Sequence, residues 1–416
     1  MNNDDVSRYS KRFLQYFWDP LPKNDDSTPI CCLGRMYDSE PSLVTPASPP
    51  PADSTASPGK EQVDEALQKG WPSDFVADVE AKLWLTYRSN FPPIAKSADP
   101  KAAGAMSLST RLKLLGNQGG FTSDTGWGCM IRSGQTLLAN CLMLLETGRD
   151  WRRSGIADAE LSILSLFADD PSAPFSIHRF VEHGAAACGK HPGEWFGPSA
   201  TARCIQALTR THHPGNLRVY VRPDDSDVYE DSLFSLARDA AGNFQPTLIL
   251  LGTRLGIDRV TPVYRSALSA ALAMTQSVGI VGGRPSSSHY FIGTQGSYFF
   301  YLDPHTTRPA LPCNPTADDC ASCHTRRLRR IHIDEMDPSM LLGFLIRSED
   351  EWKEWRKAIS QHATSDTPDV KAKPIIHIHD TEPQYSGSGS DQGERTGERA
   401  EAVDEVESCD EDETLQ

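Results

Sequence analysis

Residues 123–132 read Ser-Asp-Thr-Gly-Trp-Gly-Cys-Met-Ile-Arg, and Cys129 in this stretch directly precedes a long apolar segment. Apolar and small residues then recur at helical spacing as far as Leu145, and Gly148 supplies a stop signal. We therefore predict a helix that begins at Cys129. A thiol at a helix N-terminus feels the positive end of the helix dipole, which lowers its pKa and favours the thiolate. An isolated cysteine is more often a small buried hydrophobic residue, so a nucleophilic Cys129 requires a base elsewhere.

A candidate base follows the second of two aromatic runs. Residues 290–292 and 298–302 flank a short polar turn, which predicts a hairpin. Asp303 and His305 follow the second aromatic run and are separated by one residue. We expect their side chains to point the same way along an extended chain. A carboxylate on one imidazole nitrogen would leave the other free to act on a thiol or a leaving amine. Alone this pattern is weak, but with Cys129 it predicts a catalytic triad.

Periodicity outside these motifs predicts further elements of secondary structure. The pattern indicates a first strand at 30–33, a helix over 74–87, buried strands at 218–221 and 247–251, and a closing helix over 349–362. A helix for the nucleophile followed by a sheet that bears the acid–base pair suits a papain-like fold.

Several longer motifs resemble one family in register. Residues 125–132 and 302–306 closely resemble the nucleophile and acid–base segments of the autophagins, the autophagy cysteine peptidases. Five further segments are similar to the same family: residues 30–35, 86–94, 193–198, 276–285 and 335–340. Motifs of this length in order along the chain are far more specific than a cysteine and a histidine alone.

The resemblance implies an α/β (α+β) architecture of the papain-like cysteine peptidase type. In this fold the nucleophile lies at the N-terminus of a central helix packed on a sheet that carries the Asp and the His. We expect one catalytic domain over 28–365, interrupted at about 38–60 by a Pro-rich insertion that cannot build a core. Residues 1–27 are predicted to be a flexible N-terminal segment, and 366–416 a disordered acidic tail.

The resemblance also implies a substrate and a mechanism. Autophagins cleave ubiquitin-like autophagy modifiers of the GABARAP type after a C-terminal glycine, and they release the same modifier from phosphatidylethanolamine. We expect Cys129 to attack the glycine carbonyl, His305 to protonate the leaving amine and Asp303 to orient the imidazole. The backbone N–H of Cys129 is a natural donor to the oxyanion, and the resemblance implies that Tyr87 is the second donor.

A site selective for glycine requires a narrow slot, since only a residue without Cβ would enter it. The resemblance implies that Trp195 walls this slot, and that a loop containing Gly282, Gly283 and Pro285 covers it and lifts for the substrate. Without the resemblance, Tyr87 and Trp195 would be interpreted as core aromatic residues, and the two glycines as a turn.

Charge and composition exclude other classes of protein. Residues 380–416 carry thirteen acidic residues and two arginines, which is most of the formal net charge of −15. The sequence has no basic stripe of the kind by which nucleic-acid-binding proteins contact the phosphate backbone. The sequence shows neither an apolar run long enough to span a membrane nor an N-terminal signal peptide. We therefore expect a soluble, monomeric, cytoplasmic protein, with the nucleus and autophagosome-forming membranes as further locations and transient contact with a membrane surface.

We expect no cofactor and no metal. The pattern Cys320-x-x-Cys323-His324 could indicate zinc, but a second ligand pair at suitable spacing is missing, which favours free thiols in a loop. Two other functions stay open. A thiol acyltransferase or transglutaminase-like enzyme would pass the thioester to an amine rather than to water, and a non-catalytic scaffold would bind the modifier with an inactive site.

Overall fold

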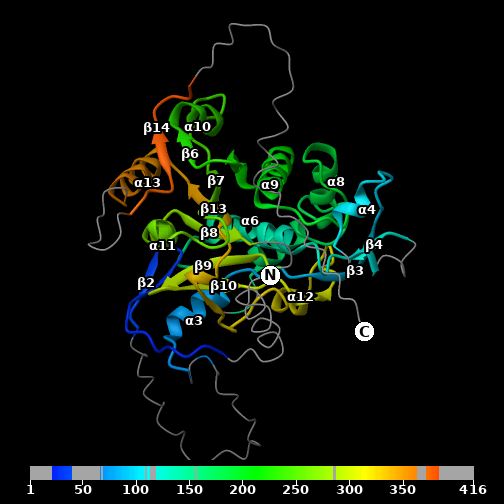
Figure 1. The fold of residues 1–416 in the computed structure, drawn as a ribbon, viewed down its shortest axis with the longest axis horizontal. Helices are drawn as coiled ribbons and strands as arrows, with labels where there is room; N and C mark the ends of the chain where they lie inside the picture. Colours follow the sequence, from blue (N-terminus) through cyan, green and yellow to red (C-terminus); the bar gives the residue numbers. More distant parts are fainter. Residues whose placement is uncertain are drawn as a thin grey trace, which may run out of the picture.

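A mixed β-sheet forms the centre of the protein in the computed structural model shown in Figure 1. The structure describes residues 21–39, 66, 69–107, 110–112, 119–153, 155, 157–283, 287–362 and 372–383. The strands lie in the order β12-β10-β9-β8-β13-β7-β5, and β1 pairs with β9 and with β2. Their bounds are β1 Ile30–Cys32, β2 Arg35–Tyr37, β5 Arg218–Arg222, β7 Thr247–Arg254, β8 Ser277–Gly282, β9 His289–Gln295, β10 Tyr298–Leu302, β12 Arg330–His332 and β13 Ser339–Ile346.

Helices surround this sheet, and two smaller sheets lie beside it. The helices are α3 Ser73–Glu80, α4 Ala102–Ala105, α6 Cys129–Thr147, α7 Asp158–Leu166, α8 Ile177–Ala187, α9 Pro198–His212, α10 Glu230–Ala237, α11 Arg265–Ala273, α12 Ala317–Ala321 and α13 Glu349–His362. One small sheet pairs β3 Arg88–Ile94 with β4 Phe121–Ser123 and β11 Arg308–Pro309; the other pairs β6 Asp227–Tyr229 with β14 His377–His379. None of the described helices is long and apolar enough to cross a membrane.

The residues of β13 explain why helices cover both faces of the main sheet. All eight residues of this strand are buried. A Cβ at Gly343 would lie 2.8 Å from Val278 and 3.1 Å from Leu137 of α6, so glycine allows the helix to approach closely. The next residue, Phe344, packs on Trp355 of α13 with ring centroids 5.2 Å apart. Because successive side chains of a strand point to opposite faces, α6 and α13 lie on opposite sides, as Figure 1 shows.

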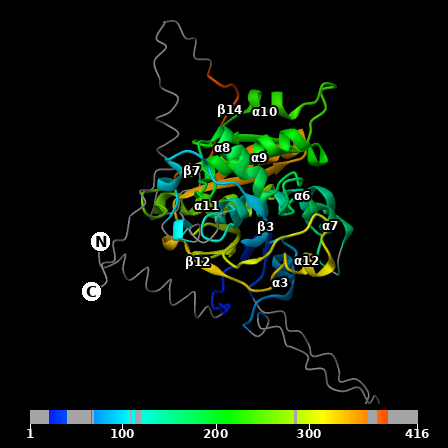
Figure 2. The same cartoon turned by 90° about the vertical axis from the view of Figure 1, so that its right-hand side faces the viewer.

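The central helix α6 confirms the prediction made from the Cys129 segment. It begins at Cys129 and ends where Gly148 adopts a φ of 79°, and its first fifteen residues are all buried. A Cβ at Gly134 would lie 2.4 Å from Thr201 of α9, so glycine permits this helix pair to pack tightly. Figure 2 shows α9 in turn lying beside α8. The helix that carries the cysteine is therefore enclosed by the sheet and by other helices.

The helix predicted over 74–87 is wrong in its second half. The helix α3 ends at Glu80, and residues 83–87 lead into β3 without regular secondary structure. The backbone N–H of Leu83 donates to Oδ1 of Asn140 on α6 (3.0 Å), and Nδ2 of Asn140 donates back to the Leu83 carbonyl (2.9 Å). A side chain on another element thus satisfies this backbone, which local periodicity cannot reveal.

The N-terminal boundary of the domain lies earlier than predicted. Part of the segment 1–27 is ordered, because residues 21–27 pack on the domain. Trp71 Nε1 donates to the Pro22 carbonyl (2.7 Å), and Gln295 Nε2 donates to Oδ1 of Asn24 (2.9 Å). The remaining residues of that segment, and nearly all of the Pro-rich insertion, lie outside the described residues.

The C-terminal boundary lies later than predicted. The prediction of disorder for 366–416 is wrong for residues 372–383, which contain β14 and lie along β6 and α10. Ile375 and Ile376 are buried, and they anchor the segment to the domain. The acidic composition of the surrounding sequence hides this short apolar stretch. The other residues of the predicted tail lie outside the described part of the chain.

Candidate active site

Cys129 is the first residue of α6, and its side chain is completely buried. The turn before it is tight, because the Asp124 carbonyl accepts the N–H groups of both Trp127 (3.1 Å) and Gly128 (2.8 Å). A Cβ at Gly128 would lie only 2.4 Å from Oδ2 of Asp124. Glycine is therefore required for the turn that brings the thiol to the helix N-terminus, where the helix dipole favours a thiolate.

His305 and Asp303 form the predicted carboxylate–imidazole pair. Nδ1 of His305 lies 2.5 Å from Oδ1 of Asp303, and the backbone N–H of His305 donates to the same oxygen (3.0 Å). These residues follow β10 in a turn, so the expectation of an extended chain is wrong although the pairing is found. The second carboxylate oxygen of Asp303 lies 2.5 Å from Nη1 of Arg329, and its carbonyl accepts Trp84 Nε1 (2.8 Å).

The electrostatics of the pair favour a thiolate facing an imidazolium. Burial alone would raise the pKa of Cys129, but the hydrogen bond and charge of His305 lower it below its ordinary value, aided by the Ser288 backbone and the Tyr87 hydroxyl. Burial would lower the pKa of His305, but its hydrogen bonds to Asp303 and Cys129 raise it to about 10. Both shifts favour the thiolate–imidazolium pair over a neutral thiol and a neutral imidazole.

Tyr87 lies beside His305 and Cys129, and its role as a donor to the oxyanion stays a prediction. Its ring meets the ring of His305 edge-on, with centroids 5.4 Å apart. Its backbone N–H donates to the Pro304 carbonyl (2.8 Å), and its carbonyl accepts the N–H of Arg308 (2.9 Å). The buried hydroxyl has no regular hydrogen-bond partner in the described chain, and it lies close to the Cys129 sulfur. Burial and the thiolate charge raise the pKa of Tyr87, so the hydroxyl keeps its proton and can donate.

His289, at the start of β9, also belongs to this cluster. Its ring lies 4.4 Å from the ring of Tyr301 and 5.6 Å from that of His305. Polar atoms of His289, Asp303 and His305 lie within 4.8 Å of one another. No sequence pattern singles out His289, because only the pairing of β9 with β10 brings it to the turn that carries Asp303 and His305.

Trp195 is half-buried and lies in a tightly packed segment. A Cβ at Gly193 would lie 2.3 Å from the ring of Phe121, and Phe121 packs on Trp127 with centroids 5.7 Å apart. This chain of contacts links the Trp195 segment to the turn before Cys129. Within the described residues, Trp195 makes no hydrogen bond or ring stacking with Cys129 or His305, so its role as a slot wall stays a prediction.

Of the predicted loop residues, the structure describes only the two glycines, and Pro285 lies outside the described residues. Gly282 ends β8, where a Cβ would lie 2.7 Å from the Ser339 carbonyl of β13. Gly283 has a φ of 143° and donates its N–H to the same carbonyl (3.1 Å). Both glycines therefore anchor the loop to the sheet. Beyond the loop, the Ser288 hydroxyl lies 3.3 Å from that of Ser133 on α6.

The cysteines considered for zinc lie in a separate buried cluster. Cys320 belongs to α12 rather than to a loop, and its sulfur lies 4.0 Å from Nε2 of His324. The same nitrogen lies 3.0 Å from Oε1 of Glu160, which is also 3.6 Å from Nε of Arg153. The Arg153 guanidinium lies beside the same carboxylate, and we interpret this cluster as a structural ion network; the absence of a metal stays a prediction.

Comparison with known proteins assigns the chain to a family. Its sequence matches the peptidase C54 catalytic domain over residues 72–358, which is more than half of its length. The chain belongs to the peptidase C54 family. This membership confirms the resemblance to the autophagins, and together with the mixed helices and sheets it confirms the papain-like α/β fold class.

Proteins named cysteine protease atg4 are similar to this chain over nearly its whole length. The chain is 57% identical to the probable cysteine protease atg4 of Botryotinia fuckeliana, with 99% of this chain and 98% of that protein covered. It is 52% identical to the probable cysteine protease atg4 of Aspergillus oryzae (99% and 100% covered). It is also 52% identical to the cysteine protease atg4 of Emericella nidulans (99% and 98% covered).

Proposed function

We propose that this C54 family member is an autophagy-related cysteine peptidase that cleaves after the C-terminal glycine of a ubiquitin-like modifier of the GABARAP type. Family membership and the similarity to fungal proteins called cysteine protease atg4 support the class of enzyme. The observation that carries the proposal is the buried Cys129 with the half-buried His305 beside it and Asp303 on the far nitrogen of the imidazole. We propose that the same site both matures the precursor and releases the modifier from phosphatidylethanolamine.

The reaction begins with attack by the Cys129 thiolate on the glycine carbonyl carbon, which forms a tetrahedral oxyanion. The Tyr87 hydroxyl and the Cys129 backbone N–H are the donors for this oxyanion. The His305 imidazolium then gives its proton to the amine nitrogen as the carbon–nitrogen bond breaks, which leaves a thioester on Cys129. Water attacks the thioester while the now neutral His305 takes one of its protons; the sulfur leaves, which restores the Cys129 thiolate and the His305 imidazolium, and the glycine acid is released as a carboxylate with its proton passing to solvent.

Asp303 and its neighbours support this proton transfer. The carboxylate holds Nδ1 of His305, so Nε2 points toward the sulfur and the leaving amine. Burial would raise the pKa of Asp303, but the hydrogen bond and charge of His305, with His289 and Arg329, hold it below its ordinary value. Asp303 thus stays ionised and stabilises the imidazolium.

Selectivity for glycine completes the proposal. Both the precursor peptide bond and the link to phosphatidylethanolamine are amides of a glycine carbonyl, so one site serves both. We propose that Trp195 walls a slot for this glycine, and that the loop of Gly282, Gly283 and Pro285 covers it. The partners are the soluble and the lipid-linked modifier, met by a cytoplasmic monomer that contacts the membrane surface transiently.

The proposal is tested by cleavage of a GABARAP-type precursor that carries residues beyond its terminal glycine. The intact chain should cleave after the glycine, and Cys129→Ala and His305→Ala should not. An added amine that captures the acyl group in place of water would indicate the acyltransferase. Tight binding of the precursor by the wild-type chain without cleavage would indicate the scaffold and contradict the proposal.

A further inference from the structure

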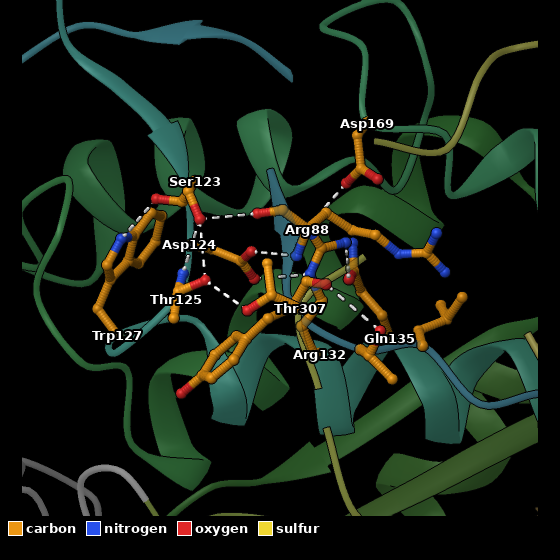
Figure 3. Close-up of polar contacts among 12 residues, drawn as sticks. Arg88, Ser123, Asp124, Thr125, Trp127, Arg132, Gln135, Asp169 and Thr307 are labelled. Atoms are coloured by element: carbon orange, nitrogen blue, oxygen red, sulfur yellow. Dashed lines mark hydrogen bonds and ion pairs between the residues drawn. The ribbon is translucent and has the colours of Figure 1, made fainter. Parts of the chain in front are cut away.

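A buried ion network lies one helical turn from Cys129. Arg132 is 1% exposed, and its Nε lies 2.7 Å from Oδ2 of Asp124. Its Nη2 lies 2.8 Å from Oδ1 of Asp169, and its Nη1 donates to Oε1 of Gln135 (3.1 Å). Figure 3 shows this guanidinium between carboxylates that come from different segments of the chain.

The network is costly to bury, which suggests a role besides stability. Asp124 and Asp169 are 0% and 2% exposed, so two carboxylates share one guanidinium out of contact with water. Buried ion pairs often contribute little net stability compared with apolar residues of similar size. Burial raises the pKa of Asp124 despite the charge of Arg132, which reflects this cost.

Asp124 connects the network to two parts of the active site. Its Oδ1 accepts the backbone N–H of Arg88 (2.6 Å), the residue after Tyr87. Its backbone carbonyl accepts the N–H of Gly128, the residue before Cys129. The placement of Asp124 therefore fixes both the oxyanion donor and the turn that carries the sulfur.

Asp169 connects the network to the segment that carries the imidazole. Its Oδ2 accepts the backbone N–H of Leu311 (2.8 Å), and its own N–H donates to the Leu311 carbonyl (2.8 Å). Leu311 follows His305 by six residues. A hydroxyl contact also joins the turn before Cys129 to the segment that carries His305. Oγ1 of Thr125 lies 2.9 Å from Oγ1 of Thr307, as Figure 3 shows.

We propose that Arg132 is a positioning residue that, through Asp124 and Asp169, sets the placement of His305 relative to Cys129 and Tyr87. This inference rests on the proposed function in taking Cys129 and His305 as the reacting pair. Chemistry at the site is sensitive to this placement, because a misplacement of about 1 Å can cost about 10²-fold in rate. The guanidinium suits the task, since it stays charged and its separate nitrogens reach both carboxylates at once.

The test compares two buried aspartates in the full chain. Asp169→Asn keeps the size of the side chain but removes the charge that Arg132 holds. Asp78→Asn is the matched control, because Asp78 is 3% exposed and lies 2.7 Å from Nζ of Lys82 and 3.2 Å from Nη1 of Arg152. None of these control residues contacts the reacting pair in the described chain.

Two readouts separate positioning from a loss of stability. Turnover is measured on the modifier precursor at a temperature where both variants are folded, and iodoacetamide alkylation of Cys129 is followed against pH. Asp169→Asn should lower kcat about 10²-fold with KM within about threefold, and it should raise the pH at which Cys129 becomes reactive. Asp78→Asn should leave both readouts unchanged. Equal effects of the two variants, or a wild-type profile for Asp169→Asn, would overturn the proposal.

A second variant covers the case in which Asp169→Asn does not fold. Arg132→Lys keeps the buried positive charge, but an ammonium cannot reach both carboxylates at once as the planar guanidinium does. We expect about a tenfold loss of kcat with KM within about threefold, and a shift of the alkylation profile in the same direction as in Asp169→Asn. A wild-type kcat and a wild-type profile for Arg132→Lys would overturn the proposal.

The alkylation readout also distinguishes the two proposals. If the precursor is not cleaved but the Cys129 profile depends on both His305 and Asp169, the substrate proposal fails and the positioning role stands. If the wild-type profile does not depend on His305, there is no reacting pair to position, and both proposals fail.

Discussion

The two buried cysteines of α6 differ in chemistry although they share a helix. Cys129 and Cys141 are both completely buried, and twelve residues of helix place them about 18 Å apart. Burial raises the pKa of Cys141, and Arg149 opposes this only weakly. At Cys129 the same effect of burial is outweighed by His305, so its pKa is lowered. A buried thiol thus becomes a nucleophile only where other elements bring a cation and donors to it.

Removing each sulfur should give the largest contrast. Cys129→Ala should lower kcat on the modifier precursor by about 10⁶-fold, because no other group at the site can form the thioester. Cys141→Ala is the matched control, since it removes an equally buried sulfur from the same helix and should leave kcat unchanged. A loss of turnover in Cys141→Ala, with the protein folded, would show that the two sulfurs do not differ as described.

The pH profile should report the ion pair. The reactive state needs the thiolate and the imidazolium together, so kcat/KM should rise through an acid limb below the ordinary thiol value of about 8.5. It should then fall as the pH rises through about 10, where His305 loses its proton. A profile that keeps rising to pH 10, as expected for an unperturbed thiol such as Cys141, would mean that the pair is not charged near neutrality.

Weakening the ion pair between Arg329 and Asp303 should lower kcat much less than removing the Cys129 sulfur does. Arg329→Gln removes a cation that helps to hold the pKa of Asp303 down, so the imidazolium is stabilised less and kcat should fall by about tenfold. Arg330→Gln is the control, because Arg330 pairs with Asp25 instead (2.6 Å). Steady-state kinetics of the two variants would measure this difference. Equal losses of kcat would show that Arg329 has no specific effect on the proton transfer by His305.

The smallest effect on activity should come from Cys141, whose substitution should change stability instead. Cys141→Ala creates a small void in the core, and we expect it to reduce the free energy of unfolding by about 1–2 kcal/mol. Urea denaturation would measure this loss, and an unchanged midpoint would show that Cys141 contributes no packing.

Sequence alone predicted the parts of the site that are contiguous in the chain. The helix from Cys129 follows from its own apolar spacing, and the contact between Asp303 and His305 needs only neighbouring residues. The placement of Tyr87 came from family resemblance, while local periodicity suggested a helix there. His289 and Arg132 depend on contacts between segments far apart in the chain, so no local pattern revealed them.

The boundaries of the domain show the same limit. Residues 21–27 and 372–383 lack strong periodicity, and each is ordered by contacts with distant residues, such as Trp71 with the Pro22 carbonyl and β6 with β14. Composition described their surroundings correctly as polar. It could not indicate which short stretches find a partner on the domain.

The central claim is that His305 converts the buried Cys129 into a thiolate, and alkylation resolved for each cysteine tests it most directly. Iodoacetamide modification followed by peptide mass spectrometry across pH should show Cys129 reacting with an inflection below about pH 8.5, while Cys141 stays unmodified. In His305→Ala the Cys129 inflection should move above this value. A Cys129 inflection at or above the ordinary thiol value in the wild-type chain, or one that is the same without His305, would contradict the account.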